Sequence, residues 1–413
     1  MTARLRIAVL SRNFSPTAGG AERYSIALVE KLSARHEVHV FAQSIHHNWP
    51  GVTYHLVKTP LRRPRWLNQL WFATATWWAT RQRSELGLDN GKGNGTRNNQ
   101  STGFDVVHSH ENTWHGNVQT VHVLPVKYNL FHDRTGGRLV LRWLKVLTSP
   151  RLLVYLGLEH CRYAPQPGRA VVVTSSSLLA MFKAAYPAAA EMASVITPGI
   201  ELPTLPVSDA NKYAEKYAAR QQLGLPQAQP CILFVGNDLR KKGLQTLLEA
   251  LRFLSDQVVL AVVGDSPQLP EFRHQVKTAG LSARVFFLGA LSDVGIAYRA
   301  ADCLAHPTLE DTFAMVVLEA MAHALPVVVS SAQYCGVAGL LENELNALIL
   351  EDPRQAAALG NALDRILNHP DRASSMGRNA RAFAEKFEWY NIAAQQETLY
   401  QKITNTRVFK PPV

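Results

Sequence analysis

Asp311 and Glu319 are two carboxylates eight positions apart, which is slightly more than two turns of a helix. At that spacing both side chains can face one site. The residues between them begin a predicted helix, and the free N–H groups of a helix's first turn bind anions. We expect the backbone of Phe313, Ala314 and Met315 to supply such groups. Donors that suit a diphosphate and carboxylates that suit hydroxyls together predict a site for a sugar nucleotide.

Three consecutive basic residues, Arg240, Lys241 and Lys242, follow a second predicted strand, Cys231–Val235. Gly236 ends that strand. Basic side chains at a strand–helix junction can pair with a diphosphate through charge-assisted hydrogen bonds. Such side chains would also stabilise the negative charge that develops on a leaving diphosphate. An exposed basic turn without a ligand is the alternative interpretation.

The elements that must position these residues are strands followed by helices. Residues 302–330 read as a strand, Cys303–His306, an acidic loop, Thr308–Thr312, a helix near 314–322 and a further strand after Pro326. This order is typical of a parallel βαβ unit, whose ligands bind at the carboxyl ends of the strands. The strands are near-continuous apolar runs, as expected when both faces of a parallel sheet are buried. The sequence therefore predicts the α/β class.

The length and the loops suggest how the chain is divided. A chain of 413 residues is too long for one ordinary core and suits two domains. A proline-rich stretch at 199–206 predicts a hinge between a domain over residues 1–198 and a domain over residues 207–389. Segment 87–103 is rich in Gly, Asn and Ser, so we expect a flexible insertion, to which we assign no function.

Charge is unevenly distributed between the two halves. Residues 1–200 hold 23 Lys/Arg and 10 Asp/Glu, a net of +13, whereas residues 201–413 hold 20 and 22, a net of −2. This excess predicts an anionic partner for the first domain, such as an acidic membrane, a phosphorylated glycolipid or nucleic acid. A generally soluble basic surface is the alternative. Nucleic acid is disfavoured because the chain has no zinc finger, RRM-like aromatic motif or basic helix with heptads.

The segment 61–83 combines several Trp and Phe residues with arginines at both ends. This composition predicts a helix lying in a membrane interface. Alternatively, its tryptophans pack on the domain core or cover an acceptor groove. No window reaches the roughly 18 apolar residues that a spanning helix needs, and the N-terminus reads as a strand rather than a signal peptide. Four scattered cysteines without a CxxC pair favour a reducing cytoplasm and predict no zinc site.

Histidines cluster around the predicted strand Val118–Val121. His122 follows this strand at its carboxyl end, where ligands collect in α/β sheets. We expect His108 to be a buried structural residue. Weaker candidates, for the acceptor side of a site, are His110, Glu111, Asn112 and His115. A metal site is disfavoured because the histidines are spread over two strands and a loop without cysteine.

The segment from Asp311 to Val328 resembles a known family. Asp-x-Phe-x-x-x-x-x-Glu-Ala-Met-Ala followed by Leu-Pro-Val-Val is similar to the donor-site signature of retaining glycosyltransferases of the GT-B fold, family 4. The pattern is closest to lipopolysaccharide-core glucosyltransferases, and the likeness covers nearly the whole chain except the insertion. Asp311 stands where Glu is usual. Ala314 stands where Gly is usual, and its side chain narrows the space in which the backbone approaches the phosphates.

The resemblance implies two Rossmann-like parallel-sheet domains that face each other across a cleft. The N-terminal domain would bind the acceptor and the C-terminal domain the nucleotide sugar, and a last helix at 390–404 would cross back to the first domain. The resemblance also implies roles for single residues. Gly19, Gly20 and Lys242, with Arg240 or Lys241, would contact the diphosphate, and Glu319 would contact the ribose. Asp311 and His122 would contact the sugar, and the main chain near Leu288 would contact the nucleobase.

The implied activity is the transfer of a sugar, with retention and without a metal, from a nucleotide diphosphate sugar carrying a UDP- or GDP-linked hexose. The implied acceptor is a glycan or glycolipid, such as lipopolysaccharide core or a cell-surface polysaccharide precursor. We identify no protein nucleophile, because front-face attack guided by the leaving phosphate needs none. Alternatives are a nucleotide-sugar epimerase of the same fold and a non-catalytic sugar-nucleotide-binding protein. We expect a cytoplasmic protein, peripherally associated with the inner face of the membrane.

Overall fold

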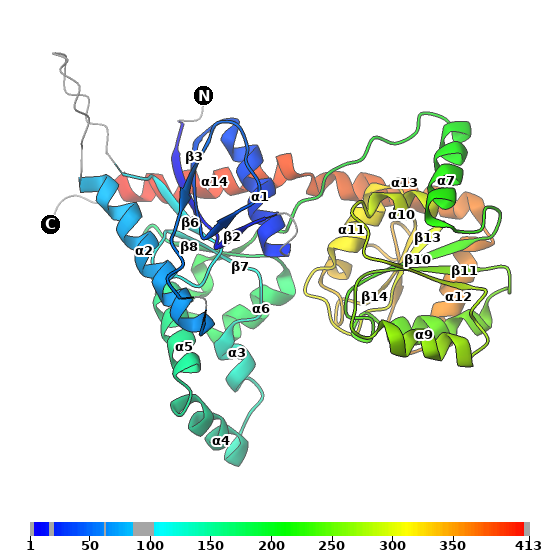
Figure 1. Ribbon diagram of the computed structural model, residues 1–413, viewed down its shortest axis with the longest axis horizontal. Coiled ribbons are helices and arrows are strands. Elements are labelled where there is room, and N and C mark those ends of the chain that lie inside the picture. The colour runs from blue at the N-terminus through cyan, green and yellow to red at the C-terminus, as the bar shows by residue number, and fades with distance from the viewer. Residues whose placement is uncertain (1–3, 16–19, 62, 86–102, 409–413) are drawn as a thin grey trace. The chain divides into compact units, whose positions relative to one another are not determined.

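The structure is a computed structural model that describes residues 4–15, 20–61, 63–85 and 103–408 (Figure 1). Gly19 and the predicted insertion, apart from Gly103, lie outside the described residues. The chain forms two compact units, one from Met1–Pro198 together with Trp389–Val413 and the other from Gly199–Glu388. The first unit is therefore built from two separate parts of the sequence.

The first unit is organised around a seven-stranded, all-parallel sheet of order β5-β3-β1-β6-β7-β8-β9. Its strands are β1 (Arg6–Leu10), β3 (Glu37–Ala42), β5 (Val52–Leu56), β6 (Val106–Ser109), β7 (Val118–Val121), β8 (Ala170–Val173) and β9 (Ala193–Val195). A separate two-stranded sheet pairs β2 (Asn13–Phe14) with β4 (Ser44–Ile45).

Successive residues of β1 enter different cores because side chains alternate between the faces of a strand. Ile7 and Val9 pack with α1 (Gly20–Ser33) and with α14 (Trp389–Val408), whereas Ala8 and Leu10 pack with Phe72 of α2 (Arg65–Glu85). The remaining helices of this unit are α3 (Val126–Phe131), α4 (Gly136–Leu147), α5 (Pro150–Arg162) and α6 (Ser176–Ala185).

The second unit contains a six-stranded, all-parallel sheet of order β12-β11-β10-β13-β14-β15. Its strands are β10 (Cys231–Val235), β11 (Val259–Val263), β12 (Val285–Gly289), β13 (Cys303–His306), β14 (Val327–Ser330) and β15 (Leu348–Leu350). Its helices are α7 (Asp209–Leu223), α8 (Leu244–Ala250), α9 (Leu269–Thr278), α10 (Gly295–Ala300), α11 (Met315–Ala322), α12 (Ala356–Leu367) and α13 (Pro370–Ala384).

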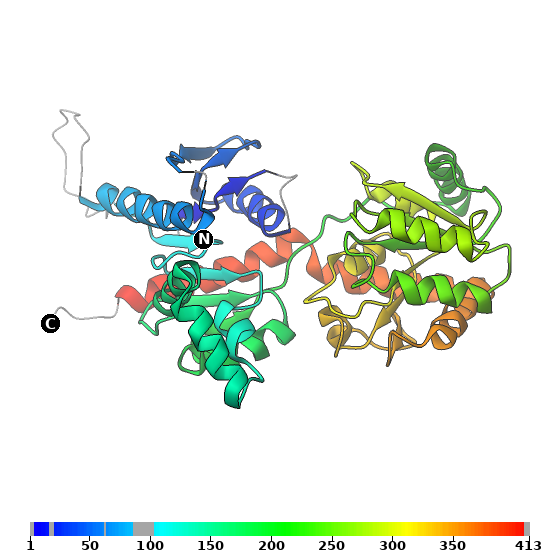
Figure 2. The ribbon, with the colours of Figure 1, turned by 60° about the horizontal axis from the view of Figure 1, so that its bottom comes forward.

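Helices cover both faces of this second sheet (Figure 2). Leu233 of β10 belongs to the core shared with α7, α10 and α11, whereas Phe234 belongs to the core shared with α8, α9 and α12. Every residue of β10 is buried. The near-continuous apolar strands of the sequence therefore follow from burial on both faces.

The predicted α/β class is confirmed, because both units contain all-parallel sheets with helices packed against them. The strands Cys231–Val235 and Cys303–His306 have the predicted bounds. The predicted aromatic helix at 61–83 is shifted, since α2 begins at Arg65 and continues to Glu85. Pro64 directly precedes its first turn, and proline is not compatible with a position inside a helix.

Candidate functional site

In the second unit the strand order reverses between β10 and β13, and open α/β sheets form a ligand crevice at such a reversal. β10 and β13 are neighbours, but the strands that follow β10 along the chain lie on one side and those that follow β13 lie on the other. Ligands of open α/β sheets bind at the carboxyl ends of strands at such a position. The two loops that leave β10 and β13 here, 236–243 and 307–314, contain most of the residues that the sequence singled out.

Two glycines let these loops make close contact. Gly243 has φ of +83°, and a Cβ there would lie 1.9 Å from the carbonyl oxygen of Pro307. Gly236 leaves room for Lys242, whose Cγ would be 2.9 Å from a Cβ at position 236. The loops are then joined by a backbone hydrogen bond of 2.8 Å from Leu309 N–H to the Lys241 carbonyl. Glycine is required at position 243 because a side chain there would push the loops apart, whereas a side chain at position 236 would displace Lys242 within its own loop.

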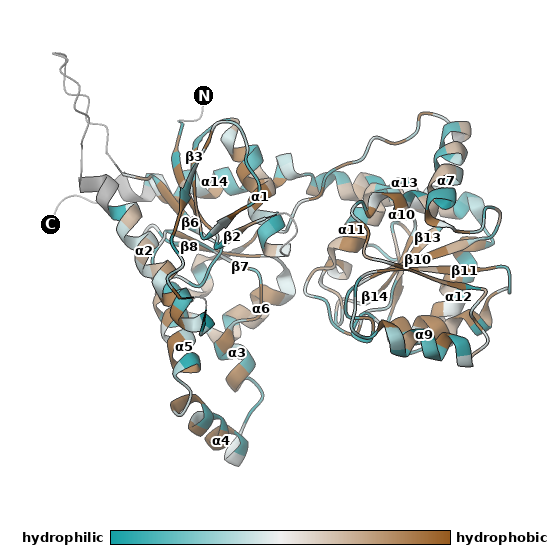
Figure 3. Ribbon diagram, in the orientation of Figure 1, coloured by the Kyte–Doolittle hydropathy of each residue, from teal (hydrophilic) through white to brown (hydrophobic). Residues whose placement is uncertain are grey.

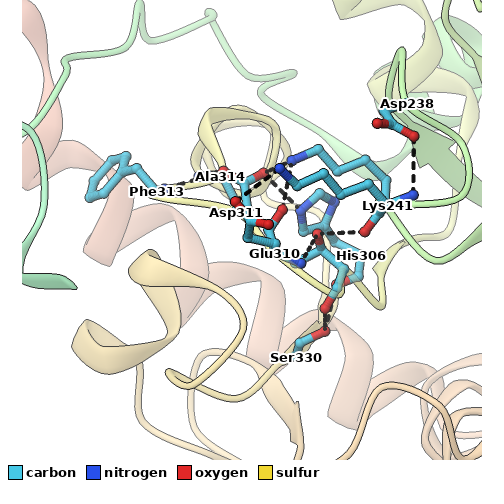
Figure 4. Close-up of polar contacts among 10 residues, drawn as sticks. Asp238, Lys241, His306, Glu310, Asp311, Phe313, Ala314 and Ser330 are labelled. Atoms are coloured by element: carbon cyan, nitrogen blue, oxygen red, sulfur yellow. Dashed lines mark hydrogen bonds and ion pairs between the residues drawn. The ribbon is translucent and has the colours of Figure 1, made fainter. Parts of the chain in front are cut away.

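Asp311 is the centre of the site (Figure 4). Its Oδ2 lies 2.5 Å from Nζ of Lys242, on the other loop, and 3.3 Å from Nε2 of His306 at the end of β13. His306 is fully buried, and the Lys242 and Asp311 side chains are 22% and 16% exposed. The ammonium group is therefore held at the crevice by a partly buried carboxylate.

The pKa of Asp311 reflects these contacts. Burial alone would raise the pKa of the carboxyl group, but the hydrogen bond with His306 and the Lys242 ammonium outweigh burial and hold the pKa well below its usual range. Burial also lowers the pKa of His306, although Asp311 opposes this effect. At neutral pH the site therefore contains an ionised Asp311 beside a charged Lys242.

The first turn of α11 differs from the sequence prediction. We expected the N–H groups of Phe313, Ala314 and Met315 to be available to an anion, but two of them are used within the protein. Asp311 Oδ1 accepts hydrogen bonds of 3.2 Å from Phe313 N–H and 2.8 Å from Ala314 N–H. Both N–H groups precede Met315, so the carboxylate fixes the turn that leads into α11, whose N-cap Ala314 has no side-chain capping hydrogen bond.

Ala314 adopts a left-handed conformation, with φ of 69° and ψ of 68°, at the N-cap of α11. This region costs a residue with a side chain roughly 1–2 kcal/mol. Ala314 is also buried. The glycine that is usual in the resembling family would therefore be the unstrained residue here, and Ala314 occupies a backbone position shaped for glycine.

The basic trio, Arg240, Lys241 and Lys242, does not act as one set in the structure. Arg240 is paired with Glu271 of α9, and Lys241 Nζ lies 2.9 Å from Glu310 Oε1. Only Lys242 contacts Asp311. Consecutive residues in a turn point in different directions, so adjacent positions in the sequence did not imply a common target. In this arrangement both side chains pair with other carboxylates, and a second charge from Arg240 or Lys241 beside Lys242 stays a prediction.

Glu319 lies on α11 and accepts a hydrogen bond of 2.7 Å from the hydroxyl of Tyr298 on α10. Tyr298 is buried, and burial followed by the nearby Glu319 charge raises the pKa of its hydroxyl well above the ordinary value. Tyr298 is therefore a neutral donor that fixes the orientation of the carboxylate. Ribose contact by Glu319 stays a prediction, as does nucleobase contact near Leu288, a half-buried residue of β12.

In the first unit, His122 follows β7 as predicted. Its Nε2 lies 3.0 Å from Nδ1 of His110, and its ring meets Tyr24 edge-on at 5.1 Å. Burial, together with the Arg162 charge, lowers the pKa of His122 to about 3. His122 is therefore neutral and packed among other rings. Contact of His122 with a donor sugar stays a prediction. Contact of Gly20, at the start of α1, with the diphosphate also stays a prediction.

The acceptor-side candidates do not form one group. Glu111 binds Arg12 through both carboxylate oxygens. Its Oε2 lies 2.8 Å from Arg12 Nε, and its Oε1 accepts a hydrogen bond of 3.0 Å from the Arg12 backbone N–H. The Asn112 carbonyl accepts from Gln69. His115 instead lines a cavity of about 460 Å³ with Trp77 and Arg169 at the amino end of the sheet. His110 alone contacts His122, so the other three residues are not brought to it.

His108 is a buried structural histidine, as expected. Its Nδ1 and Nε2 lie 2.6 Å from the hydroxyls of Tyr400 and Thr120. Within the described residues, no group of three or more His, Cys, Asp or Glu side chains is arranged to hold a metal ion. Over the same residues, no helix combines the length and apolar character needed to cross a membrane.

Four residues of the site were missed from the sequence. His306 is the last residue of its strand, and a polar residue at the carboxyl end of a buried strand could have identified it. Thr308 and Ser330 connect the loops, since the Thr308 hydroxyl donates to the Lys241 carbonyl and the Ser330 hydroxyl donates to the Thr308 carbonyl. These two carry no pattern in the sequence. Tyr298 likewise cannot be linked to Glu319 without the fold.

A known family matches the part of the chain that contains both loops of the crevice. Residues 215–383 match the family described as "Glycosyl transferases group 1". D-inositol 3-phosphate glycosyltransferase of Xylanimonas cellulosilytica is 30% identical over 54% of this chain and 54% of its own length. Lipopolysaccharide glucosyltransferase WaaG of Escherichia coli is 26% identical over 60% of this chain and 65% of its own length. The chain thus spans between half and two thirds of these relatives.

Solved structures extend the likeness to the whole fold. The crystal structure of WaaG, a glycosyltransferase involved in lipopolysaccharide biosynthesis, has a TM-score of 0.70 at 20% identity and covers 95% of this chain and 99% of that one. Anabaena HepE in complex with UDP has a TM-score of 0.66 at 21% identity, over 96% and 100% of the two chains. The fold is thus that of GT-B glycosyltransferases. The match to group 1 glycosyltransferases covers residues 215–383, within the second unit.

Proposed function

We propose that this protein transfers a hexose from a nucleotide diphosphate sugar, UDP- or GDP-linked, to a glycan or glycolipid. The observation that carries the proposal is the Lys242–Asp311–His306 cluster, which lies at the crevice between β10 and β13. Two comparisons support it: WaaG is named as a lipopolysaccharide glucosyltransferase, and HepE was crystallised with UDP. Lipopolysaccharide core or a cell-surface polysaccharide precursor is the acceptor class that fits these relatives.

Lys242 is the residue proposed to meet the diphosphate. Its ammonium is held in place by Asp311, so it needs little reorganisation when negative charge develops on the leaving group. Arg240 and Lys241 are bound to Glu271 and Glu310 and are assigned no direct part in this step. Asp311 has two roles in this scheme: it positions Lys242, and it binds the sugar hydroxyls.

Glu319 is proposed to accept hydrogen bonds from the ribose hydroxyls. The hydroxyl of Tyr298 occupies its Oε2 and holds the carboxylate in one orientation. A fixed carboxylate loses less conformational entropy on binding than a mobile one. This part of the site would therefore select a nucleoside rather than an inorganic diphosphate.

We further propose that transfer proceeds with retention and without a metal ion, because Lys242 supplies positive charge that a metal would otherwise provide. No cofactor beyond the donor substrate is required in this scheme. The basic first half of the chain, with a net charge of +13 over residues 1–200, favours peripheral contact with an anionic membrane at its cytoplasmic face.

The test is to incubate the purified protein with several UDP-, GDP- and ADP-linked sugars, with and without lipid extract from a bacterial envelope. We expect nucleoside diphosphate release that is strongly increased by the extract and unaffected by EDTA. The anomeric proton signals of the product, read by NMR, should match the configuration of the donor. A free epimerised sugar without acceptor would indicate the epimerase alternative, and binding without any release would indicate a non-catalytic binding protein.

A further inference from the structure

Helix α4 carries an apolar surface that no described residue of the first unit covers. Five large apolar side chains on this twelve-residue helix are between 48% and 69% exposed, and they are Val140, Leu141, Trp143, Leu144 and Leu147. Val140, Leu144 and Leu147 recur at intervals of four and three residues, so they form one stripe along the helix. Soluble proteins rarely leave such contiguous apolar surface in water without a partner.

The opposite side of α4 attaches the helix to its unit. Val146 is buried, and Trp143 keeps one edge against Phe131 of α3, with ring centroids 4.6 Å apart. The helix also packs on α5. Figures 1 and 3 show α4 at the tip of the first unit, away from the sheet, with hydrophobic residues along much of its length. The exposed stripe is therefore held on a supported helix.

The charge around this stripe has a single sign. The sequence from Arg134 to Leu158 contains five basic residues and no acidic residue: Arg134, Arg138, Arg142, Lys145 and Arg151. Arg138 and Lys145 are seven positions apart, two turns of the helix, so they share one face, which adjoins exposed Leu141 and lies away from Val140. An apolar face bordered by cations is the arrangement of helices that lie in the interface of anionic membranes.

The sequence placed the membrane-contacting segment at 61–83, but α2 is a weaker candidate. Phe72, Gln69 and Thr76 of α2 are buried against the unit. Trp71 and Trp78 are exposed, yet the indole N–H of Trp71 donates to the Lys58 carbonyl. Two separate aromatic side chains give a smaller insertion surface than the five exposed apolar side chains of α4.

We propose that α4 is the membrane anchor of this protein, and that its Val140–Leu147 face inserts among the acyl chains of an anionic bilayer while Arg138 and Lys145 pair with lipid phosphates. A second copy of the chain is a poor occupant, because two such faces would bring their basic residues together. This inference deepens the membrane contact in the proposed function. Lipid binding can nevertheless be measured without any sugar nucleotide.

The experiment compares binding of the full chain to vesicles of phosphatidylglycerol and phosphatidylcholine with binding to vesicles of phosphatidylcholine alone. We expect at least tenfold tighter binding to the anionic vesicles. The double variant Arg138→Gln/Lys145→Gln should lose about 30-fold in affinity, since each basic residue near an anionic surface contributes about fivefold. The apolar variant Val140→Ser/Leu144→Ser/Leu147→Ser should abolish binding at 0.5 M NaCl.

Two controls separate α4 from α2 and from loss of folding. Trp78→Ser, on α2, should bind vesicles as the unmodified protein does, and all variants should keep the same urea unfolding curve. Quenching of Trp143 fluorescence by brominated lipid, taken as the difference from Trp143→Phe, should report insertion of α4 itself.

Three outcomes would overturn the proposal: equal binding to neutral vesicles, loss of binding in Trp78→Ser but not in the α4 variants, or a dimer that the α4 variants dissociate. Donor-dependent release of nucleoside diphosphate without lipid should be unchanged in the α4 variants. A failure of the anchor and a failure of the proposed transferase activity are therefore distinguishable.

Discussion

The ammonium of Lys242 and the carboxylate of Asp311 lie 2.5 Å apart although 69 positions separate them in the chain. The contact connects the loop after β10 with the loop after β13, and these are the neighbouring strands at which the sheet reverses its order. Electrostatic attraction at this point therefore has two effects. It stabilises the approach of the two loops, and it presents a fixed cation at the place where an anionic ligand would bind.

Replacing Lys242 tests the assignment of this cation. Lys242→Met should lower kcat/KM for nucleotide sugar by about 10²-fold or more, the effect typical of losing one preorganised donor to developing negative charge. Arg240→Met is the matched control, because Arg240 is bound to Glu271 and exposed, and it should change kcat/KM less than threefold. A larger effect from Arg240→Met than from Lys242→Met, measured by nucleoside diphosphate release, would reassign the site.

Glu319 can be separated into a structural and a binding role. Glu319→Ala leaves the buried Tyr298 hydroxyl without its acceptor, so we expect a loss of about 1–3 kcal/mol in the free energy of unfolding together with weaker donor binding. Glu319→Gln retains an acceptor oxygen and should recover most of the stability but not the donor affinity. Calorimetric titration with nucleoside diphosphate and urea unfolding provide the two measurements. Full donor affinity in Glu319→Gln would argue against ribose contact.

Ala314 offers a change that should stabilise the protein. Ala314→Gly removes the side chain from a residue with φ of 69°, and we expect the free energy of unfolding to rise by about 1 kcal/mol. Ala320→Gly, in the middle of the same helix, should instead lower it by about 1 kcal/mol because glycine is a poor helix former. Urea unfolding checks both, and two changes of the same sign would contradict the strain assigned to Ala314.

Gly243 and Gly224 form a matched pair for the loop contact. Both have positive φ, but a Cβ at Gly243 would lie 1.9 Å from the Pro307 carbonyl, whereas a Cβ at Gly224 would meet nothing within 4 Å. Gly224→Ala should cost roughly 1–2 kcal/mol from backbone strain alone. Gly243→Ala should cost clearly more and also weaken donor binding, since it separates the loops. Equal losses of stability would show that the loop contact is unimportant.

Buried histidines predict a pH dependence of stability. Burial, followed by the charges of His122 and Arg162, lowers the pKa of His108 to about 3. In the unfolded chain this pKa is about 6.5, so unfolding takes up a proton. The stabilisation from neutral His108 is complete above pH 6.5 and is lost as pH falls toward 3. The loss from this residue is about 2 kcal/mol at pH 5.

The measurement is the difference in unfolding free energy between pH 7.5 and pH 5 for the unmodified protein and for His108→Gln. Glutamine can still hydrogen-bond to Tyr400 but takes up no proton. The variant should therefore lose about 2 kcal/mol less than the unmodified protein over this range. Parallel pH profiles would mean that His108 is already protonated in the folded protein.

The sequence predicted an element well where one run of apolar residues was enough to define it. Strand β10 was predicted with its true bounds because a run of five buried apolar residues has few alternatives in an α/β chain. Asp311 and Glu319 also fall in the predicted βαβ unit, which β13, α11 and β14 form. The family likeness then identified the fold, which the parallel sheets and the structural neighbours confirm.

Side-chain partners were much less predictable. Arg240, Lys241 and Lys242 are adjacent in sequence, yet each pairs with a different carboxylate, because direction within a turn changes at every residue. His110 and His115 are five positions apart, but one contacts His122 and the other lines a cavity. The exposed stripe of α4 was also missed, since its apolar residues looked like those of any helix that packs on a core.

The last helix has a consequence for how the protein is made. Trp389, Ile392 and Tyr400 of α14 are core residues of the first unit, and the Tyr400 hydroxyl contacts His108 of β6. Residues 1–198 therefore leave the ribosome without the helix that completes their interior, whereas residues 199–388 are contiguous. The second unit can mature first during synthesis, and residues 1–198 cannot complete their interior until α14, Trp389–Val408, has been synthesised.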